Sequence, residues 1–115
     1  MLTEPRKINV LGTEIRVEFH TEEEDSLLVE CAGYYDATVN MIVVKNHDKD
    51  YAVKDPEAVQ RKTLRHEIIH AFLHESGLDW SSTSVDAWAT NEEMVDWFAI
   101  QSPKIFKVFQ EQGLM

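Results

Sequence analysis

The chain has 115 residues, 43% of them hydrophobic and 10% aromatic, which fits a single domain over residues 1–115. Acidic residues outnumber basic ones by 21 to 11, so the net charge is −10, and such a surface argues against a nucleic-acid partner. No apolar run approaches the roughly eighteen residues that cross a bilayer, and no signal peptide is evident, so we expect a cytoplasmic protein without membrane contact.

The first half of the chain has the alternating apolar pattern of β-strands. Apolar residues alternate on both sides of a possible turn in Lys7–Phe19, which predicts a hairpin. A second group of β-branched and aromatic residues follows, and a turn at Asp36-Ala37 predicts a strand over Thr38–Val44.

The segment between these strands has two possible structures. Thr21 and Glu24 have the spacing of a capping box, which favours a short helix over Glu22–Val29. The apolar end of this segment is equally compatible with a strand. Cys31, the only cysteine, lies in an apolar stretch, and we expect it to be a small buried side chain.

One long helix is predicted from Pro56 to Ser76. Asp55 supplies an N-cap, Pro56 fits the first helical position, and Gly77 suits the C-terminus. Its histidines and most of its apolar residues fall on opposite faces. We therefore expect the apolar face to pack on the sheet and the histidine face to border a cleft.

Helices also end the chain. After a Ser/Thr-rich connection over Leu78–Thr90, Asn91 can cap a helix that runs to about Gln101. Ser102-Pro103 then predicts the start of a separate last helix, which ends at Gly113. The predicted fold is therefore α+β, with a small, mostly antiparallel N-terminal sheet packed on a long helix and followed by C-terminal helices.

The long helix carries His66-Glu67-Ile68-Ile69-His70, a His-Glu-x-x-His motif. Two histidines one turn apart can bind one zinc ion from the same face. Glu67 is rotated by about 100° from His66, so it points beside the ion rather than at it. There it can take a proton from a zinc-bound water, whose pKa zinc lowers to about 7.

His74 continues the histidine stripe but is a poor third ligand. It lies two turns from His66, about 12 Å along the axis of a continuous helix. A break after His70 would be needed, and Leu73 stands where a glycine would allow it. His74 is therefore expected to line the cleft, to support a ligand, or to be a partly exposed surface residue.

Glu92 is the better candidate for the third ligand. Asp96 lies one turn further on the same face and could accept the free N–H of a ligand histidine. Val95 and Ala99 share that face, so it should point inward, and the small Ala99 permits close approach to another helix. Glu93 is the alternative ligand, although an exposed acid in the first turn of a helix is common.

These two motifs resemble those of the zincin metallopeptidases, in particular the branch with a glutamate ligand. The pair "HEIIH" and "NEEMVD" is similar to that branch's His-Glu-x-x-His with a downstream Asn-Glu-x-x-x-Asp. The stretch "EEMVDWFA" also resembles the second motif of ImmA/IrrE-type metallopeptidases, Glu-x-x-Ala-Asn-x-Phe-Ala, with Val95 and Asp96 as departures. Both alignments imply that Glu92 binds the metal, and the first implies that Asp96 orients a histidine.

Small phage- and prophage-encoded proteins of this kind carry a similar helix, and the resemblance covers roughly Gly33–Gln101. It implies that an edge strand, taken to be Thr38–Val44, flanks the cleft and pairs with a peptide substrate. It also implies a residue that stabilises the oxyanion, for which the candidates are Tyr34, Tyr35, His20 and His74. A partner protein could complete the substrate site, since little chain follows Gln101.

We therefore expect a zinc-dependent metallopeptidase. His66, His70 and Glu92 would bind Zn²⁺, and Glu67 would activate water to hydrolyse a peptide bond in a protein or peptide substrate. The alternative is a non-catalytic zinc-binding protein of the same fold, with a regulatory or phage-assembly role. A zinc hydrolase for bonds other than the peptide bond is a third reading.

Overall fold

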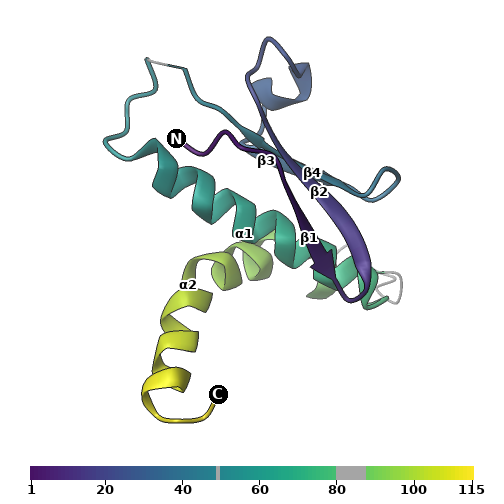
Figure 1. Ribbon diagram of the computed structural model, residues 1–115, viewed down its shortest axis with the longest axis vertical. Coiled ribbons are helices and arrows are strands. Elements are labelled where there is room, and N and C mark those ends of the chain that lie inside the picture. Colours follow the sequence, from purple (N-terminus) through teal and green to yellow (C-terminus); the bar gives the residue numbers. More distant parts are fainter. Residues whose placement is uncertain (49, 80–87) are drawn as a thin grey trace.

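The computed structural model describes residues 1–48, 50–79 and 88–115 and combines a four-stranded sheet with two long helices (Figure 1). Its elements in chain order are β1 (Arg6–Val10), β2 (Thr13–His20), the 3-10 helix η1 (Ser26–Val29), β3 (Gly33–Asp36), β4 (Met41–Lys45), α1 (Pro56–Glu75), the 3-10 helix η2 (Trp88–Thr90) and α2 (Glu92–Glu111). The sheet order is β1-β2-β4-β3, with only the β2–β4 pair parallel. The predicted α+β fold is confirmed, and α1 lies between the sheet and α2 (Figure 1).

The predicted N-terminal hairpin is confirmed. Ile8 pairs with Ile15 across β1 and β2. The turn between them places Leu11 and Gly12 at positive φ values of 50° and 94°. The Gly12 N–H donates to the Asn9 side chain over 2.9 Å, which closes the turn.

The strand predicted over Thr38–Val44 begins later and lies elsewhere in the sheet than expected. The Asp36 side chain accepts a 3.0 Å hydrogen bond from the Thr38 N–H, and Asn40 has a φ of 51°, so the turn continues to Asn40. β4 starts at Met41 and pairs with β2 on one side and β3 on the other. The expectation that this strand is an edge is wrong, because β3 occupies that edge.

The segment after β2 forms neither the α-helix over Glu22–Val29 nor a strand. The capping box forms, with the Thr21 N–H donating to Glu24 over 3.0 Å, but only a turn follows. Asp25 then caps η1 by accepting from the Leu27 N–H. Cys31 follows this short helix and is exposed rather than buried, with its thiol donating to the Leu27 carbonyl.

The main core lies between the sheet and α1. Alternate residues of β2 and β4 meet the apolar face of α1, and the buried members of this cluster are Val10, Ile15, Val17, Phe19, Ile42, Val44, Leu64 and Ala71. Gly33 allows β3 to approach α1 closely, because a Cβ there would lie 2.8 Å from the Thr63 methyl group and 2.8 Å from the Val43 carbonyl oxygen. This approach brings β3 alongside the histidine-bearing part of α1.

Near the N-terminal end of α1, Gln60 connects this helix to the N-terminal segment and to the end of β4. Its fully buried side chain accepts from the Leu2 N–H over 2.7 Å and donates to the Leu2 and Lys45 carbonyls and to the Asn46 side chain. A buried amide is costly unless it is satisfied, and here the partners come from the N-terminus and from the end of β4. Gln60 therefore fixes α1 against the sheet at a point the apolar pattern did not reveal.

The last part of the chain is one helix, not two. α2 runs through Pro103 without ending, so the separate helix predicted from Ser102-Pro103 is wrong. Proline lacks the N–H that would donate to the carbonyl four residues earlier, at Ala99. The Arg65 Nε–H donates to that carbonyl instead, over 2.6 Å, which removes the main reason for α2 to stop.

No helix among residues 1–48, 50–79 and 88–115 combines the length and the apolar character needed to cross a membrane.

Candidate metal centre

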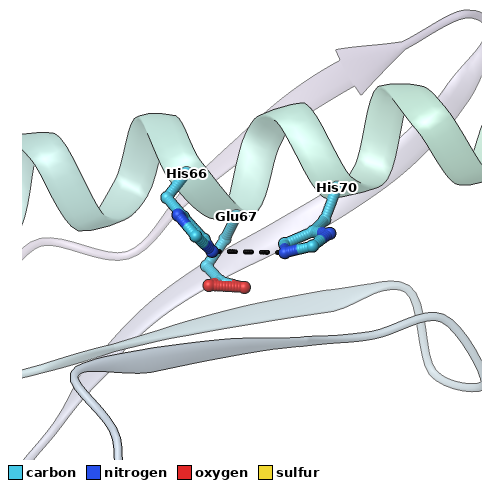
Figure 2. A group of neighbouring side chains, drawn as sticks. All are labelled: His66, Glu67 and His70. Carbon is cyan, nitrogen blue, oxygen red and sulfur yellow. Dashed lines mark hydrogen bonds between the residues drawn. The ribbon is translucent and has the colours of Figure 1, made fainter. Parts of the chain in front are cut away.

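The caps of α1 place the His-Glu-x-x-His motif in the middle of a continuous helix. The Asp55 side chain accepts from the Ala58 N–H over 3.0 Å, and Pro56 is the first helical residue. The helix ends at Glu75, one residue before the predicted end, and Gly77 follows with a φ of 83°. Figure 2 shows His66 and His70 pointing to the same side of this helix, one turn apart.

The two histidines and Glu92 bring three potential ligand groups together. The Nε2 atoms of His66 and His70 lie 3.2 Å apart. One Glu92 oxygen lies 3.2 Å from the His66 Nε2, and the other lies 2.9 Å from the His70 Nε2. Glu92 reaches this position from the first turn of α2, although its side chain is 70% exposed.

These spacings suit a tetrahedral ion. Two ligand atoms at zinc distances, both on one tetrahedral centre, lie roughly 3.2–3.5 Å apart. The two Nε2 atoms, 3.2 Å apart, fall in this range, whereas the two Glu92 contacts of 3.2 and 2.9 Å involve different oxygens of that carboxylate. Burial also lowers the pKa of His70, which favours the neutral imidazole that a metal requires. The imidazole and carboxylate groups present are therefore of the kind that zinc binds.

Glu67 is as close to the two histidines as a further ligand would be, and by position alone it forms a possible metal-binding group with them. Its carboxylate hangs below His66 on the side to which the imidazoles point (Figure 2), and its ligand atom lies within 4.8 Å of those of both histidines. The residue is only 6% exposed. Burial raises the pKa of Glu67 to about 7, against the opposing effect of nearby His66. A carboxylate with such a pKa can both accept and return a proton near neutral pH.

Asp96 supports His66 from α2. Its Oδ1 atom lies 3.3 Å from the His66 Nδ1 and accepts a 2.8 Å hydrogen bond from the Lys62 ammonium group. The bond to Lys62 lowers the pKa of Asp96, with His66 adding to the shift. An ionised Asp96 can hold the Nδ1 proton of His66, which leaves the Nε2 lone pair for a metal. Lys62, one turn before His66, was missed in the sequence although it lies on the same stripe.

These residues line a cleft of about 470 Å³ between β3, α1 and α2. The wall formed by β3 and its approach is Cys31, Ala32, Gly33, Tyr34 and Tyr35; the opposite wall is Lys62, Thr63, His66, Glu67, His70, Asp79, Glu92 and Asp96. Glu93 is exposed and is absent from both walls. Within the described part of the chain, Glu92 contacts His66 and His70, whereas Glu93 does not.

His74 does not join His66, His70 and Glu92, as its distance of two turns from His66 predicted. Its Nδ1 atom is 2.9 Å from the Asp79 Oδ2, and its ring packs edge-on against Tyr35 with centroids 6.0 Å apart. His74 is also absent from the cleft walls. Its contact with Asp79, a wall residue, makes it a support for the far end of the cleft.

The four candidates for an oxyanion-stabilising residue differ in whether they line the cleft and in whether their donor group is already bonded. His20 contacts Glu18 and does not line the cleft. The Tyr34 hydroxyl donates to Asp25, and burial raises the pKa of Tyr34 to about 12. The Tyr35 hydroxyl is buried without a hydrogen-bond partner among the described residues, so Tyr35 is the wall residue with a donor to spare.

Asp79 is a wall residue that no sequence pattern predicted. It follows the end of α1, in the connection where only a Ser/Thr-rich linker was predicted, and no periodic pattern extends to it. Its Oδ1 atom is buried without a hydrogen-bond partner in the described part of the chain. Most of that connection, residues 80–87, lies outside the described residues.

No family model, no curated protein sequence and no solved structure matches the chain.

Proposed function

We propose that this protein is a zinc-dependent metallopeptidase-like hydrolase, in line with its resemblance to the zincins. The observation that carries the proposal is the meeting of the His66 and His70 Nε2 atoms, 3.2 Å apart, with the Glu92 carboxylate beside the buried Glu67. Three protein ligands with room for a fourth group are the arrangement of catalytic rather than structural zinc sites.

Each side chain has a defined task in this proposal. His66, His70 and Glu92 hold the ion, and Asp96 keeps the His66 ring in the orientation that directs Nε2 to it. The bound zinc would supply Lewis acidity, lowering the pKa of a coordinated water and polarising a carbonyl. Glu67 accepts the proton of the attacking water and returns it to the leaving amine; a bound cation would favour its ionised form, which is the form that accepts the proton.

We further propose that the substrate is a protein or peptide that lies along β3. This strand forms the end of the sheet order and one wall of the cleft, so its outer side can pair with an extended chain. This assignment replaces Thr38–Val44, because β4 already pairs on both sides. We assign the oxyanion to Tyr35, whose hydroxyl has no other partner among the described residues; because that hydroxyl is buried, it must turn toward the cleft when a substrate binds.

The Glu67→Gln variant tests the proposal. It keeps the shape of the side chain and removes the base, so it should bind zinc like the wild type and lose about 10²- to 10⁴-fold in turnover. Zinc content is measured by elemental analysis, and turnover with a library of internally quenched peptides. Glu93→Gln is the matched control, because Glu93 is exposed and absent from the cleft walls.

Two outcomes would contradict this function. Cleavage by Glu67→Gln at the wild-type rate would rule out Glu67 as the base. A wild-type protein that holds one zinc ion but cleaves no peptide of the library would instead favour the non-catalytic zinc-binding alternative.

A further inference from the structure

Lys62 lies where electrostatics alone would not place a positive charge. It is the one lysine or arginine among the described residues that line the cleft, and it lies one helical turn before His66 on α1. A positive charge on the wall of a cleft that is to bind Zn²⁺ repels the ion. The ammonium group therefore needs a role that outweighs this repulsion, and the contacts of Lys62 indicate one.

Asp96 is the partner of Lys62 in the described residues and is also the partner of His66. Its Oδ1 atom lies 2.8 Å from the Lys62 Nζ and 3.3 Å from the His66 Nδ1. The Asp96 side chain is 40% exposed, and an exposed carboxylate without a fixed partner exchanges between rotamers. The shorter, charge-assisted bond to Lys62 therefore holds this oxygen in place beside the His66 ring.

The orientation of the His66 ring decides which of its nitrogens is offered to a metal. Its Nε2 atom lies 3.2 Å from the His70 Nε2 and 3.2 Å from a Glu92 oxygen. A carboxylate at Nδ1 keeps the proton on that nitrogen and leaves the lone pair of Nε2 for the ion. Lys62, Asp96 and His66 thus form a chain of contacts that begins on α1, crosses to α2 and returns to α1.

We propose that Lys62 is a positioning residue of the zinc centre: it holds the Asp96 carboxylate at the Nδ1 atom of His66 and so keeps Nε2 directed to the ion. Lys62 touches neither the ion nor the substrate in this role. The inference rests on the zinc site of the proposed function but not on peptide hydrolysis. Zinc affinity therefore tests it even in a protein that cleaves no peptide.

Competition for zinc between the metal-free full chain and a chromophoric chelator, at one fixed pH, measures this role. Lys62→Met keeps the aliphatic stem and removes the ammonium group, so the dissociation constant for zinc should rise about three- to tenfold. This effect is smaller than the roughly 10- to 100-fold expected on loss of a partner that contacts the ligand itself. Lys62→Arg should stay within about twofold of the wild type, because a guanidinium group also donates to a carboxylate.

Arg61→Met is the matched control. Arg61 precedes Lys62 on α1 and does not line the cleft. Its guanidinium group contacts Asp55 and Glu57 instead. The variant removes the same charge from the same turn of the helix, so its zinc affinity should stay within about twofold of the wild type. Circular dichroism and denaturant unfolding establish that every variant is folded.

The sign of the effect in a second background separates positioning from general damage to the fold. In Asp96→Ala, Lys62 has no carboxylate to hold and only repels the ion, so adding Lys62→Met should there tighten zinc binding. Damage to the contact between the helices would instead weaken zinc binding in both backgrounds, and that result would overturn the proposal.

Two results with Asp96 intact would also overturn it. Tighter zinc binding by Lys62→Met would show that Lys62 only repels the ion or competes with His66 for Asp96. Unchanged zinc affinity would remove Lys62 from the metal centre, and a raised KM for a cleaved peptide would then assign it to the substrate. A wild type that binds no zinc would overturn the inference together with the proposed function, whereas cleavage by Glu67→Gln at the wild-type rate would overturn the function alone.

Discussion

The two hollows beside the α1–α2 contact have similar sizes and opposite linings. The cleft has a volume of about 470 Å³ and carries three acids and two histidines from the helices, whereas a groove of about 500 Å³ on the other flank is apolar except for Arg65 and Ser102. Volume alone therefore says little about function, because only the cleft presents groups that can bind a metal or move a proton.

A narrow contact separates the two hollows. Val95 and Ala99 of α2 are fully buried against α1, and the small Ala99 lets the helices come close. On the cleft side of this contact lie Glu92 and Asp96; on the groove side lie Met94 and Phe98. One helix pair can thus hold a charged site and an apolar surface because the period of the helix sends neighbouring residues to different flanks.

The largest expected effect that distinguishes the hollows is stabilisation by zinc. Zinc at a thousand times its dissociation constant should raise the free energy of unfolding by about 4 kcal/mol. Glu92→Ala removes a cleft carboxylate and should weaken zinc at least about a hundredfold, which lowers this gain by about 3 kcal/mol at the same zinc concentration. Thermal and denaturant unfolding with zinc or with a chelator measure both values.

Two controls make this test specific. Glu93→Ala, on the neighbouring exposed position, and Phe98→Ser, in the groove, should retain the full response to zinc. If Glu93→Ala lost the stabilisation by zinc and Glu92→Ala kept it, Glu93 rather than Glu92 would be the zinc ligand. An equal loss in Phe98→Ser would mean that the hollows are not independent.

The next effect concerns the contact between the hollows. Arg65→Leu leaves the Ala99 carbonyl without a donor, because Pro103 has no N–H to replace it. We expect a loss of about 2 to 3 kcal/mol in the free energy of unfolding. Pro103→Ala restores the missing N–H, so Arg65→Leu should cost clearly less in that background. Additive effects in this double-mutant cycle would show that the bond to Arg65 does not compensate for the proline.

The hydrogen bond from Arg65 to Ala99 is an example of a feature that the sequence-based prediction of the fold could not include. The hairpin and α1 follow from local signals: alternation in Lys7–Phe19, and the caps Asp55 and Gly77 around the long helix. The Ala99 carbonyl that Pro103 leaves without a helical donor is bonded by Arg65, 34 positions from it along the chain. A local pattern has no access to such a contact. The position of β4 inside the sheet is likewise set by pairing between distant segments.

The candidate site was predictable where its residues share a helix or a motif. His66, Glu67 and His70 come from one stretch of helix, and their geometry follows from the helical repeat. Glu92 and Asp96 were selected by their shared face, and they meet the histidines in the structure. The cleft wall from β3 and the residue Asp79 were not predictable, because the close approach of β3 at Gly33 and the chain path after α1 are tertiary features.

The smallest expected effect is the destabilisation of the metal-free protein by the buried carboxylate of Glu67. Burial holds the pKa of Glu67 at about 7, above its ordinary value of 4.5, so the fold favours the protonated acid. The ionised form therefore destabilises the fold, an effect absent below pH 4.5 and complete above about pH 7. Relative to the wild type, Glu67→Gln should gain about 2 kcal/mol at pH 8 and nothing near pH 4.

Denaturant unfolding with a chelator present, repeated across this pH range, measures the difference. Glu93→Gln serves as the control and should differ from the wild type by less than about 0.5 kcal/mol throughout, since its side chain is exposed. A gain that did not depend on pH would attribute the effect to packing rather than to charge. Added zinc should shrink the gain, because a cation beside Glu67 favours the ionised carboxylate. A buried carboxylate that destabilises the metal-free protein and is relieved by metal would fit the proposed hydrolase, and none of the described residues that line the groove could titrate in this way.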